Sequence, residues 1–325
     1  MSDDLGAVVI TRPLPFLEPS RISDTGRTVR ILDQPEGPTP ATLRESARDA
    51  AALVVNGDVI DAQFFEAVPT LQVVAQYGIG VDNIDLAAAE AAGVTVVNLP
   101  DAVTESTVEL TIGLLLACAR RIVEADRLVR QFRRFPPGAD SLMSEGLHDR
   151  RLGIIGPGRI GRRVATVARA LGMRVHYWGR TSRPDMETAL GATRHSNITT
   201  LCHHVDALSI HVPSTPETLH LLGEQQLAAL PAGAIVVNTA RGSVVDEEAL
   251  ARALAAEHLG SVGLDVFEGE PDIRPALLDH PHTVLTPHVG TSTVNARKRM
   301  SRIILEEVAA VLTGQEPRYP VRPQA

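Results

Sequence analysis

The chain has 325 residues, 44% of them hydrophobic, and a formal net charge of −8 at pH 7. This length favours about two domains, and the arginines are scattered, so no basic surface for nucleic acid or anionic lipid is indicated. The longest apolar run, Leu110–Ala119, is about half of a membrane-spanning helix. We therefore expect a small-molecule partner, with no nucleic acid and no membrane.

The N-terminus and the cysteines indicate the compartment. Met1-Ser2-Asp3-Asp4 is acidic and lacks the positive start of a signal peptide, so we expect a cytoplasmic protein. Cys118 and Cys202 are far apart and match no metal-ligand spacing. We expect both to be reduced, structural thiols.

Short β-branched runs alternate with Ala- and Leu-rich stretches, a pattern typical of parallel βα units. The early strands are expected at Ala7–Thr11, Val29–Asp33, Ala52–Asn56, Leu71–Gln76 and Val94–Asn98. Helices are expected at Thr42–Ala50 and Leu86–Ala92, and an irregular connection at Pro13–Arg27. This region predicts one small α/β domain.

A second series follows a long predicted helix, Val108–Gln131, and a Pro-Pro-Gly break at Pro136–Gly138. Its strands are expected at Leu152–Ile155, Arg174–Trp178, Ala207–His211, Ala234–Asn238, Ser261–Leu264 and Thr283–Thr286. Six strands with intervening helices suit a doubly wound dinucleotide-binding fold. A last amphipathic helix, Thr293–Leu312, could return the chain to the first domain.

A glycine-rich loop opens this second series. Gly156, Gly158 and Gly161 form Gly-x-Gly-x-x-Gly between a predicted strand and a predicted helix, Arg162–Leu171. Such glycines permit a tight turn, close backbone approach to a pyrophosphate and close helix packing, with the helix N-terminus facing the anion. The pattern alone is weak, but its strand–loop–helix context favours dinucleotide binding.

The turn after the second strand of this series indicates which dinucleotide is bound. An acidic residue usually ends that strand and holds the ribose hydroxyls of NAD, but Gly179 stands here. Arg180, Thr181, Ser182 and Arg183 follow, a set suited to a 2′-phosphate. The alternative is that these arginines are solvated loop residues. We expect NADP(H), with NAD possible.

Three later segments carry groups suited to hydride chemistry on a 2-keto acid: Val237–Asp246, Gly263–Pro271 and Leu285–Gly290. Reduction of a ketone needs a proton donor and a cation that orients the carboxylate, which His288 and Arg241 can supply. Glu270 could keep the imidazole oriented and protonated. Each residue alone could equally have no catalytic role, since a lone arginine is usually at the surface and a lone histidine is usually structural.

The chain resembles the D-isomer-specific 2-hydroxyacid dehydrogenases over nearly its whole length. The matching stretches are Gly78–Asp85, Gly156–Gly161, His211–Pro213, Asn238–Asp246, Asp265–Pro271 and Thr286–His288. The resemblance implies catalytic roles for Arg241, Glu270 and His288, and substrate-carboxylate binding by the amides of Ile79 and Gly80. Together with the glycine-rich loop and the turn after the second strand, it gives an expected cofactor site at Thr107, Gly156, Gly158, Arg159, Ile160, Gly161, Gly179, Arg180, Thr181, Ser182, Arg183, His211, Val212, Pro213, Thr218, Thr239, Ala240, Asp265, His288 and Gly290.

The resemblance further implies two Rossmann-like domains. A flavodoxin-like substrate domain, residues 1–102 and 293–325, is expected to be split by a doubly wound dinucleotide-binding domain, residues 103–292. Hinge closure between the domains would expel water before hydride transfer. A homodimer is expected, and in related dimers the arm at residues 131–146 can reach the neighbouring active site.

The sequence departs from the family pattern in two places. Pro157 stands where the family more often has a bulky apolar residue, although the three glycines are intact, and we expect cofactor binding to survive this. The arm lacks a tryptophan that some relatives have, which puts the selection of substrate size in question.

Within the family, the absence of an acidic residue at Gly179 resembles the NADPH-using glyoxylate/hydroxypyruvate reductases. Glyoxylate or hydroxypyruvate is therefore the expected substrate. Phosphoglycerate dehydrogenase is an alternative, which the end of the chain at Ala325, without an added regulatory domain, makes less favoured. Formate dehydrogenases are disfavoured because they carry Gln where Glu270 stands. A dinucleotide-sensing corepressor is an alternative of another class.

Several residues also have ordinary interpretations. His280 and His282 do not match the usual zinc-ligand spacings, so no metal site is expected. His203 and His204 are expected to be surface residues. Tyr77, beside the substrate loop, could be a pocket wall or a core residue.

Overall fold

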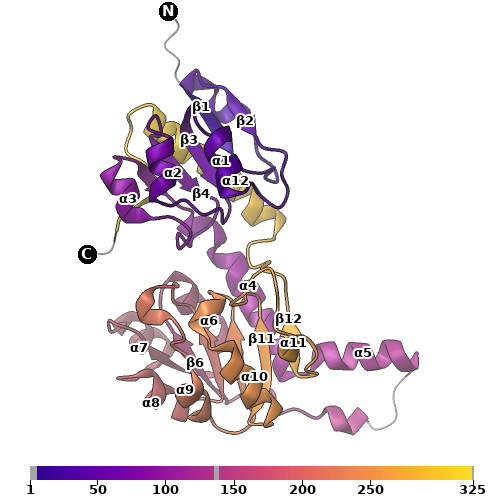
Figure 1. Ribbon diagram of the computed structural model, residues 1–325. Helices are drawn as coiled ribbons and strands as arrows, with labels where there is room; N and C mark the ends of the chain where they lie inside the picture. The colour runs from indigo at the N-terminus through magenta and orange to yellow at the C-terminus, as the bar shows by residue number, and fades with distance from the viewer. Residues whose placement is uncertain (1–5, 135–138, 324–325) are drawn as a thin grey trace, which may run out of the picture. The chain divides into compact units, whose positions relative to one another are not determined.

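The computed structural model describes residues 6–134 and 139–323, which form two compact units (Figure 1). The first contains residues up to Val103 and those from Thr291 onward, and the second is Thr104–Gly290. The Pro-Pro-Gly sequence at Pro136–Gly138 lies outside the described residues.

The first unit contains a six-stranded sheet in the order β13-β5-β4-β3-β1-β2. Its strands are β1 (Ala7–Ile10), β2 (Val29–Ile31), β3 (Ala50–Val55), β4 (Val73–Gln76), β5 (Thr95–Val97) and β13 (Pro320–Val321). Neighbours are parallel except for β13, which pairs antiparallel with β5. The order 2-1-3-4-5 of the parallel strands is that of a flavodoxin-like sheet, as expected.

Helices cover both faces of this first sheet because its strands are apolar on both sides. Its helices are η1 (Pro19–Thr25, 3-10), α1 (Pro40–Ser46), α2 (Ala62–Ala67), α3 (Leu86–Ala91) and α12 (Val294–Leu312). Val9 and Leu53 pack in one core with α1, α2 and α3, and Val8 and Val54 pack in the other core with α12.

The second unit contains a seven-stranded parallel sheet in the order β12-β11-β10-β9-β6-β7-β8. Its strands are β6 (Arg151–Ile155), β7 (Arg174–Trp178), β8 (Thr193–Arg194), β9 (Ala207–Ile210), β10 (Ala234–Asn238), β11 (Leu259–Leu264) and β12 (Thr283–Leu285). The chain reverses its direction across the sheet between β6 and β9. This reversal confirms the doubly wound fold.

The helices of the second unit are α4 (Pro100–Ala119, begun in the first unit), α5 (Ile122–Phe132), α6 (Arg159–Ala170), α7 (Pro184–Leu190), α8 (Ile198–His203), α9 (Glu224–Ala228), α10 (Glu247–Ala255) and α11 (Pro275–Leu278). Short 3-10 turns are η2 (Ala139–Leu142), η3 (Pro216–Thr218) and η4 (Gly242–Val244). Ile154 packs with α4, α6 and α7 on one face, and Ile155 packs with α8, α9 and α10 on the other.

Short polar side chains begin many of these helices. The side chains of Thr39, Asp61, Asp85, Asn197, Asp246 and Thr293 each accept a backbone N–H of the first helical turn. Each bond satisfies one donor that a helix leaves unpaired at its N-terminus.

The expected helix Val108–Gln131 is wrong as one element. The structure has α4 and α5, separated at Arg121, whose φ of 52° is left-handed. By length and composition α4 could cross a membrane, but Ile112, Leu115 and Cys118 lie in the core of the second unit, as in the core helix of a globular domain. The short elements α2, β8 and β13 were not expected, and η1 lies within Pro13–Arg27, which was expected to be irregular.

Candidate active site

Most of the candidate residues follow the strands of the second sheet. Gly156 follows β6, Gly179 follows β7, and His211, Thr239 and Asp265 follow β9, β10 and β11. Because the carboxyl ends of parallel strands meet at one edge, these loops share one side of the sheet. That edge is where ligands of doubly wound folds bind.

The glycines of the loop after β6 meet three different surroundings. A Cβ atom at Gly156, where φ is +88°, would lie 2.7 Å from the carbonyl oxygen of His211 and from the Val212 side chain. A Cβ at Gly161 would lie 2.4 Å from the carbonyl oxygen of Gly156. A Cβ at Gly158 would meet no atom within 4 Å. The loop is thus closely packed on one side and open at Gly158, where α6 begins.

The turn after β7 differs in part from the expected phosphate site. Arg180 and Thr181 are exposed. The Ser182 hydroxyl donates to Oε1 of Glu187 at 3.0 Å, a bond to the protein itself. The Nε atom of Arg183 is buried and has no hydrogen-bond partner within the described chain.

Arg194, which sequence reasoning missed, adds a further guanidinium to this turn. It lies in β8, and its Nη2 donates to the carbonyl oxygens of Gly179 at 3.4 Å and of Arg180 at 3.5 Å. Nothing in the sequence indicated this position, because Thr193 and Arg194 are both exposed and the strand has no apolar pattern.

Hydrogen bonds bring other predicted cofactor residues together in two groups. After β9, Thr218 donates through Oγ1 to the carbonyl oxygen of Pro213 at 2.7 Å. On α4, the Thr111 hydroxyl donates to the carbonyl oxygen of Thr107 and lies 2.8 Å from the hydroxyl of Thr239. Ala240 donates its N–H to the side chain of Asn238 at 3.0 Å. Thr111 was not predicted from the sequence.

Asp265 holds the loop that carries His288. Its Oδ1 accepts the Thr286 hydroxyl at 2.6 Å and the N–H of Val289 at 2.8 Å, and its Oδ2 accepts the N–H of Gly290 at 2.8 Å. Asp265 is 1% exposed, and burial raises the pKa of its carboxyl although these bonds oppose the shift. The contact with the cofactor expected for Asp265 stays a prediction.

His288 and Glu270 are paired side chain to side chain. Nδ1 of His288 lies 2.8 Å from Oε2 of Glu270, and the two side chains are 50% and 37% exposed. Burial raises the pKa of Glu270, but the hydrogen bond to His288, the N–H of Phe267 and the charges of His288 and Arg241 outweigh it and lower the pKa. Glu270 is therefore a carboxylate at neutral pH. An imidazole next to a carboxylate can act as an acid–base catalyst.

Arg241 lies after β10, directly before η4, and is half-buried. Its Nη1 donates to the carbonyl oxygen of Ala240 at 2.7 Å, and its charge is one of those that lower the pKa of Glu270. A Cβ at the next residue, Gly242, would lie 1.9 Å from the carbonyl carbon of Phe267. This close packing fixes the loop of Arg241 against the loop of Glu270.

In the first unit, the loop expected to bind the substrate carboxylate follows β4. Asn98 donates to the carbonyl oxygen of Ile79 at 2.7 Å, while the amides of Ile79 and Gly80 donate to no other atom in the described part of the chain. Tyr77 is a core residue, 2% exposed, with its hydroxyl 2.8 Å from that of Ser301. The role of the two amides stays a prediction.

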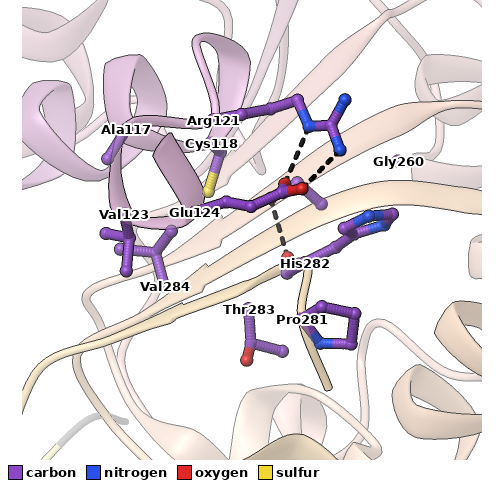
Figure 2. A pocket seen from close by; sticks show the side chains of 11 residues that line it. Ala117, Cys118, Arg121, Val123, Glu124, Gly260, Pro281, His282, Thr283 and Val284 are labelled. Atoms are coloured by element: carbon purple, nitrogen blue, oxygen red, sulfur yellow. Dashed lines mark hydrogen bonds and ion pairs between the residues drawn. The ribbon is translucent and has the colours of Figure 1, made fainter. Parts of the chain in front are cut away.

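A pocket in the second unit lies elsewhere (Figure 2). Cys118, Arg121, Gly260, Ser261 and Thr283 are among its lining residues. Gly260 and Thr283 lie near the starts of β11 and β12, at the amino end of the sheet. The candidate residues lie at the carboxyl end, so this pocket is not the candidate active site.

The donor set fits a nicotinamide dinucleotide. The open side of the loop at Gly158 precedes a twelve-residue helix, α6, whose N-terminus can receive a pyrophosphate. The buried, unpartnered Nε of Arg183 and the nearby arginines suit a further anion. The fold and these loops define an α/β protein that binds a dinucleotide at the carboxyl edge of its second sheet.

Comparisons with known proteins identify the family. The model of the D-isomer specific 2-hydroxyacid dehydrogenase NAD-binding domain matches residues 112–290. A glyoxylate reductase of Thermococcus litoralis is 38% identical, with 95% of each chain aligned, and one of Korarchaeum cryptofilum is 40% identical over 95% of this chain and 94% of the relative.

A crystal structure of an NADPH-dependent glyoxylate/hydroxypyruvate reductase from Sinorhizobium meliloti, in complex with NADP and malonate, is 31% identical with a TM-score of 0.85 and covers 98% of this chain and 99% of that one. The chain belongs to the D-isomer-specific 2-hydroxyacid dehydrogenase family. It is a nicotinamide-dependent dehydrogenase, which confirms the resemblance seen in the sequence.

Proposed function

We propose that the protein uses NADPH to reduce a short 2-keto acid, either glyoxylate to glycolate or hydroxypyruvate to the D-2-hydroxy acid. The observation that carries this proposal is the pair of His288 and Glu270, 2.8 Å apart in loops at the carboxyl edge of a dinucleotide-binding sheet. The relatives named glyoxylate reductase, and the related NADPH-dependent structure, support the substrate class.

In this proposal the reduced nicotinamide, when bound, supplies the hydride. Nδ1–H of His288 donates to Glu270, which leaves Nε2 to give a proton to the oxygen of the reacting carbonyl. Arg241 binds the substrate carboxylate and orients the carbonyl, since a guanidinium can bind a carboxylate in a bidentate way. Asp265 keeps the 286–290 loop, and hence the imidazole, in place.

The preference for NADPH rests on charge at the turn after β7. Gly179 offers no carboxylate to bind the ribose diol or to repel a phosphate. Arg180 is exposed beside it, Arg194 lies against its backbone, and Arg183 has a buried Nε without a partner in the described chain. One charge-assisted hydrogen bond contributes about 1.5–3 kcal/mol, enough for a preference of about tenfold or more.

The test is a substrate panel with the purified protein, followed by the loss of reduced-nicotinamide absorbance. Glyoxylate, hydroxypyruvate, pyruvate and 3-phosphohydroxypyruvate are each assayed with NADPH and with NADH. We expect the highest kcat/KM for glyoxylate or hydroxypyruvate with NADPH. A higher value for 3-phosphohydroxypyruvate would favour phosphoglycerate dehydrogenase, and NADPH binding without turnover would favour a dinucleotide-sensing corepressor.

We also propose that two copies of the chain associate through α5. The helix buries none of its residues and extends away from the sheet of its unit (Figure 1). Ile122, Val129 and Phe132 are 51%, 47% and 43% exposed, and their spacing places them on one helical stripe. Light scattering should give a dimer for the wild type and a monomer for Val129→Asp with Phe132→Ser. A monomeric wild type would contradict the proposal.

A further inference from the structure

Two residues far apart in the sequence, Pro157 and Gly179, occupy one confined space in the second unit. A Cβ atom at Gly179 would lie 2.6 Å from Cδ and 2.9 Å from Cγ of Pro157. Real Cβ atoms essentially never approach other atoms so closely. The next nearest atom, the carbonyl oxygen of Thr181, is at an ordinary 3.7 Å. The ring of Pro157 is therefore the obstacle to a side chain at position 179.

The ring cannot move aside as a flexible side chain could. Cδ of a proline is bonded to its own backbone nitrogen, so its position follows the backbone. Pro157 is buried, and the N–H of Gly156 donates to the carbonyl oxygen of Trp178 at 3.0 Å, which ties the glycine loop to the end of β7. A shift of the ring would therefore disturb the loop that receives the pyrophosphate.

The other tight glycines of this region are confined by backbone. The nearest atom to a Cβ at Gly161 is the carbonyl oxygen of Gly156, at 2.4 Å, which no side-chain replacement removes. Gly179 also has no positive φ that would strain another residue. Removing the Pro157 ring alone should leave space for a side chain at position 179. It would leave no such space at position 161.

We propose that Pro157 is a specificity-determining residue: its ring requires glycine at position 179 and so excludes the carboxylate that would select NAD. This inference rests on the NADPH preference proposed above. The preference for NADPH over NADH is therefore determined jointly by the residues at positions 157 and 179. An aspartate placed at position 179 alone does not fit, and the cofactor preference changes only when the ring is also removed.

The test is a double-mutant cycle with alanine, which adds a Cβ but no charge. Wild type, Pro157→Ala, Gly179→Ala and the double variant are compared by thermal midpoint and by the Kd for NADPH and for NADH, read from nicotinamide fluorescence. We expect Gly179→Ala to weaken both dinucleotides by about tenfold or more, and the added Pro157→Ala to recover most of that loss. Additive effects would overturn the proposal, as would a double variant that does not recover.

Gly161→Ala is the matched control, because Pro157→Ala should not rescue it. A second comparison then tests selectivity. Gly179→Asp with Pro157→Ala should prefer NADH, whereas Gly179→Asp alone should bind both dinucleotides poorly. Equal reversal in the two variants would overturn the proposal. If the wild type prefers NADH, the proposed cofactor preference fails, but the alanine cycle still decides whether Pro157 excludes a side chain at position 179.

Discussion

The carboxylate of Glu247 accepts a hydrogen bond from the backbone N–H of Glu268, with 2.7 Å between Oε1 and N. Glu247 is the first residue of α10 and is 4% exposed, and Glu268 lies two residues before Glu270. Burial raises the pKa of Glu247, and the hydrogen bond from Glu268 opposes this shift without cancelling it. The bond thus fixes the loop of Glu270 to the helix that follows Arg241.

Glu247 is therefore expected to act as a positioning residue. Glu247→Ala removes the acceptor, so the loop of Glu270 loosens, and we expect kcat/KM for the keto acid to fall by about tenfold or more. Glu247→Gln keeps a side-chain oxygen that can accept the same N–H, and should retain most of the activity. The pH profile of Glu247→Ala should also change, because Glu270 is displaced. A profile and rate like those of the wild type would contradict this role.

Arg241→Ala should separate substrate binding from cofactor binding. We expect the loss of most of kcat/KM for the keto acid, about 10²-fold or more, because the charge that orients the carboxylate is gone. NADPH binding, measured by fluorescence, should stay within a few-fold. Arg241→Lys keeps the charge without the bidentate geometry, so its kcat/KM should lie between that of the wild type and that of Arg241→Ala. Equal losses in substrate turnover and NADPH binding would show that Arg241 belongs to the cofactor site.

The strands could be predicted where apolar runs are short and sharply bounded. β7 and β10 coincide with the expected Arg174–Trp178 and Ala234–Asn238. The break between α4 and α5 at Arg121 could not be predicted, because no glycine or proline marks it and arginine rarely adopts positive φ. A bidentate ion pair there, from Arg121 to Glu124 at 2.7 and 2.8 Å, is seen only in the folded chain.

The candidate site was predictable as residue types but not as contacts. His288, Glu270 and Arg241 stand in recognisable motifs, and the family resemblance suggested a role for each. The sequence could not show that Ser182 bonds to Glu187, that Asp265 holds the loop of His288, or that Glu247 is buried. These facts depend on which chain segments the sheet brings together, and no local pattern records them.

Asp206 joins the starts of β6 and β9, and its removal should destabilise the second unit. It accepts the backbone N–H of Arg151 at 2.8 Å and two guanidinium hydrogen bonds at 2.7 and 3.0 Å. Burial raises the pKa of Asp206, but these interactions with Arg151 outweigh it and lower the pKa. The stabilisation is therefore fully present above the ordinary value of 3.8 and is lost as the pH falls below it.

We expect Asp206→Asn to lower the free energy of unfolding by about 1–3 kcal/mol at neutral pH. The difference from wild type in thermal midpoint should shrink as the pH falls below 3.8, the ordinary value of the Asp206 carboxyl. Asp185→Asn is the control, because Asp185 also pairs with an arginine, Arg162 at 3.0 Å, but is 57% exposed. Its thermal midpoint should stay close to that of wild type. A pH-independent effect of Asp206→Asn would contradict the electrostatic account.

The pairing of His288 with Glu270 predicts opposite consequences for the two directions of the reaction. Reduction of the keto acid needs the protonated imidazole, so its rate falls at high pH, whereas oxidation of the hydroxy acid needs the neutral imidazole and rises with pH. The lowered pKa of Glu270 makes it a carboxylate throughout the neutral range, and its Oε2 lies 2.8 Å from Nδ1 of His288.

Glu270→Gln replaces the charge beside His288 by a neutral amide, so we expect both pH-dependent limbs, the fall of reduction and the rise of oxidation, to move to lower pH. The measurement is kcat/KM against pH in both directions for wild type and Glu270→Gln. His288→Ala is the reference, since it should lower reduction by about 10²–10⁴-fold and remove the limbs altogether. If neither limb moves in Glu270→Gln, Glu270 is a structural residue. If the limb moves for reduction or for oxidation but not for both, the titration belongs to the substrate or to another group.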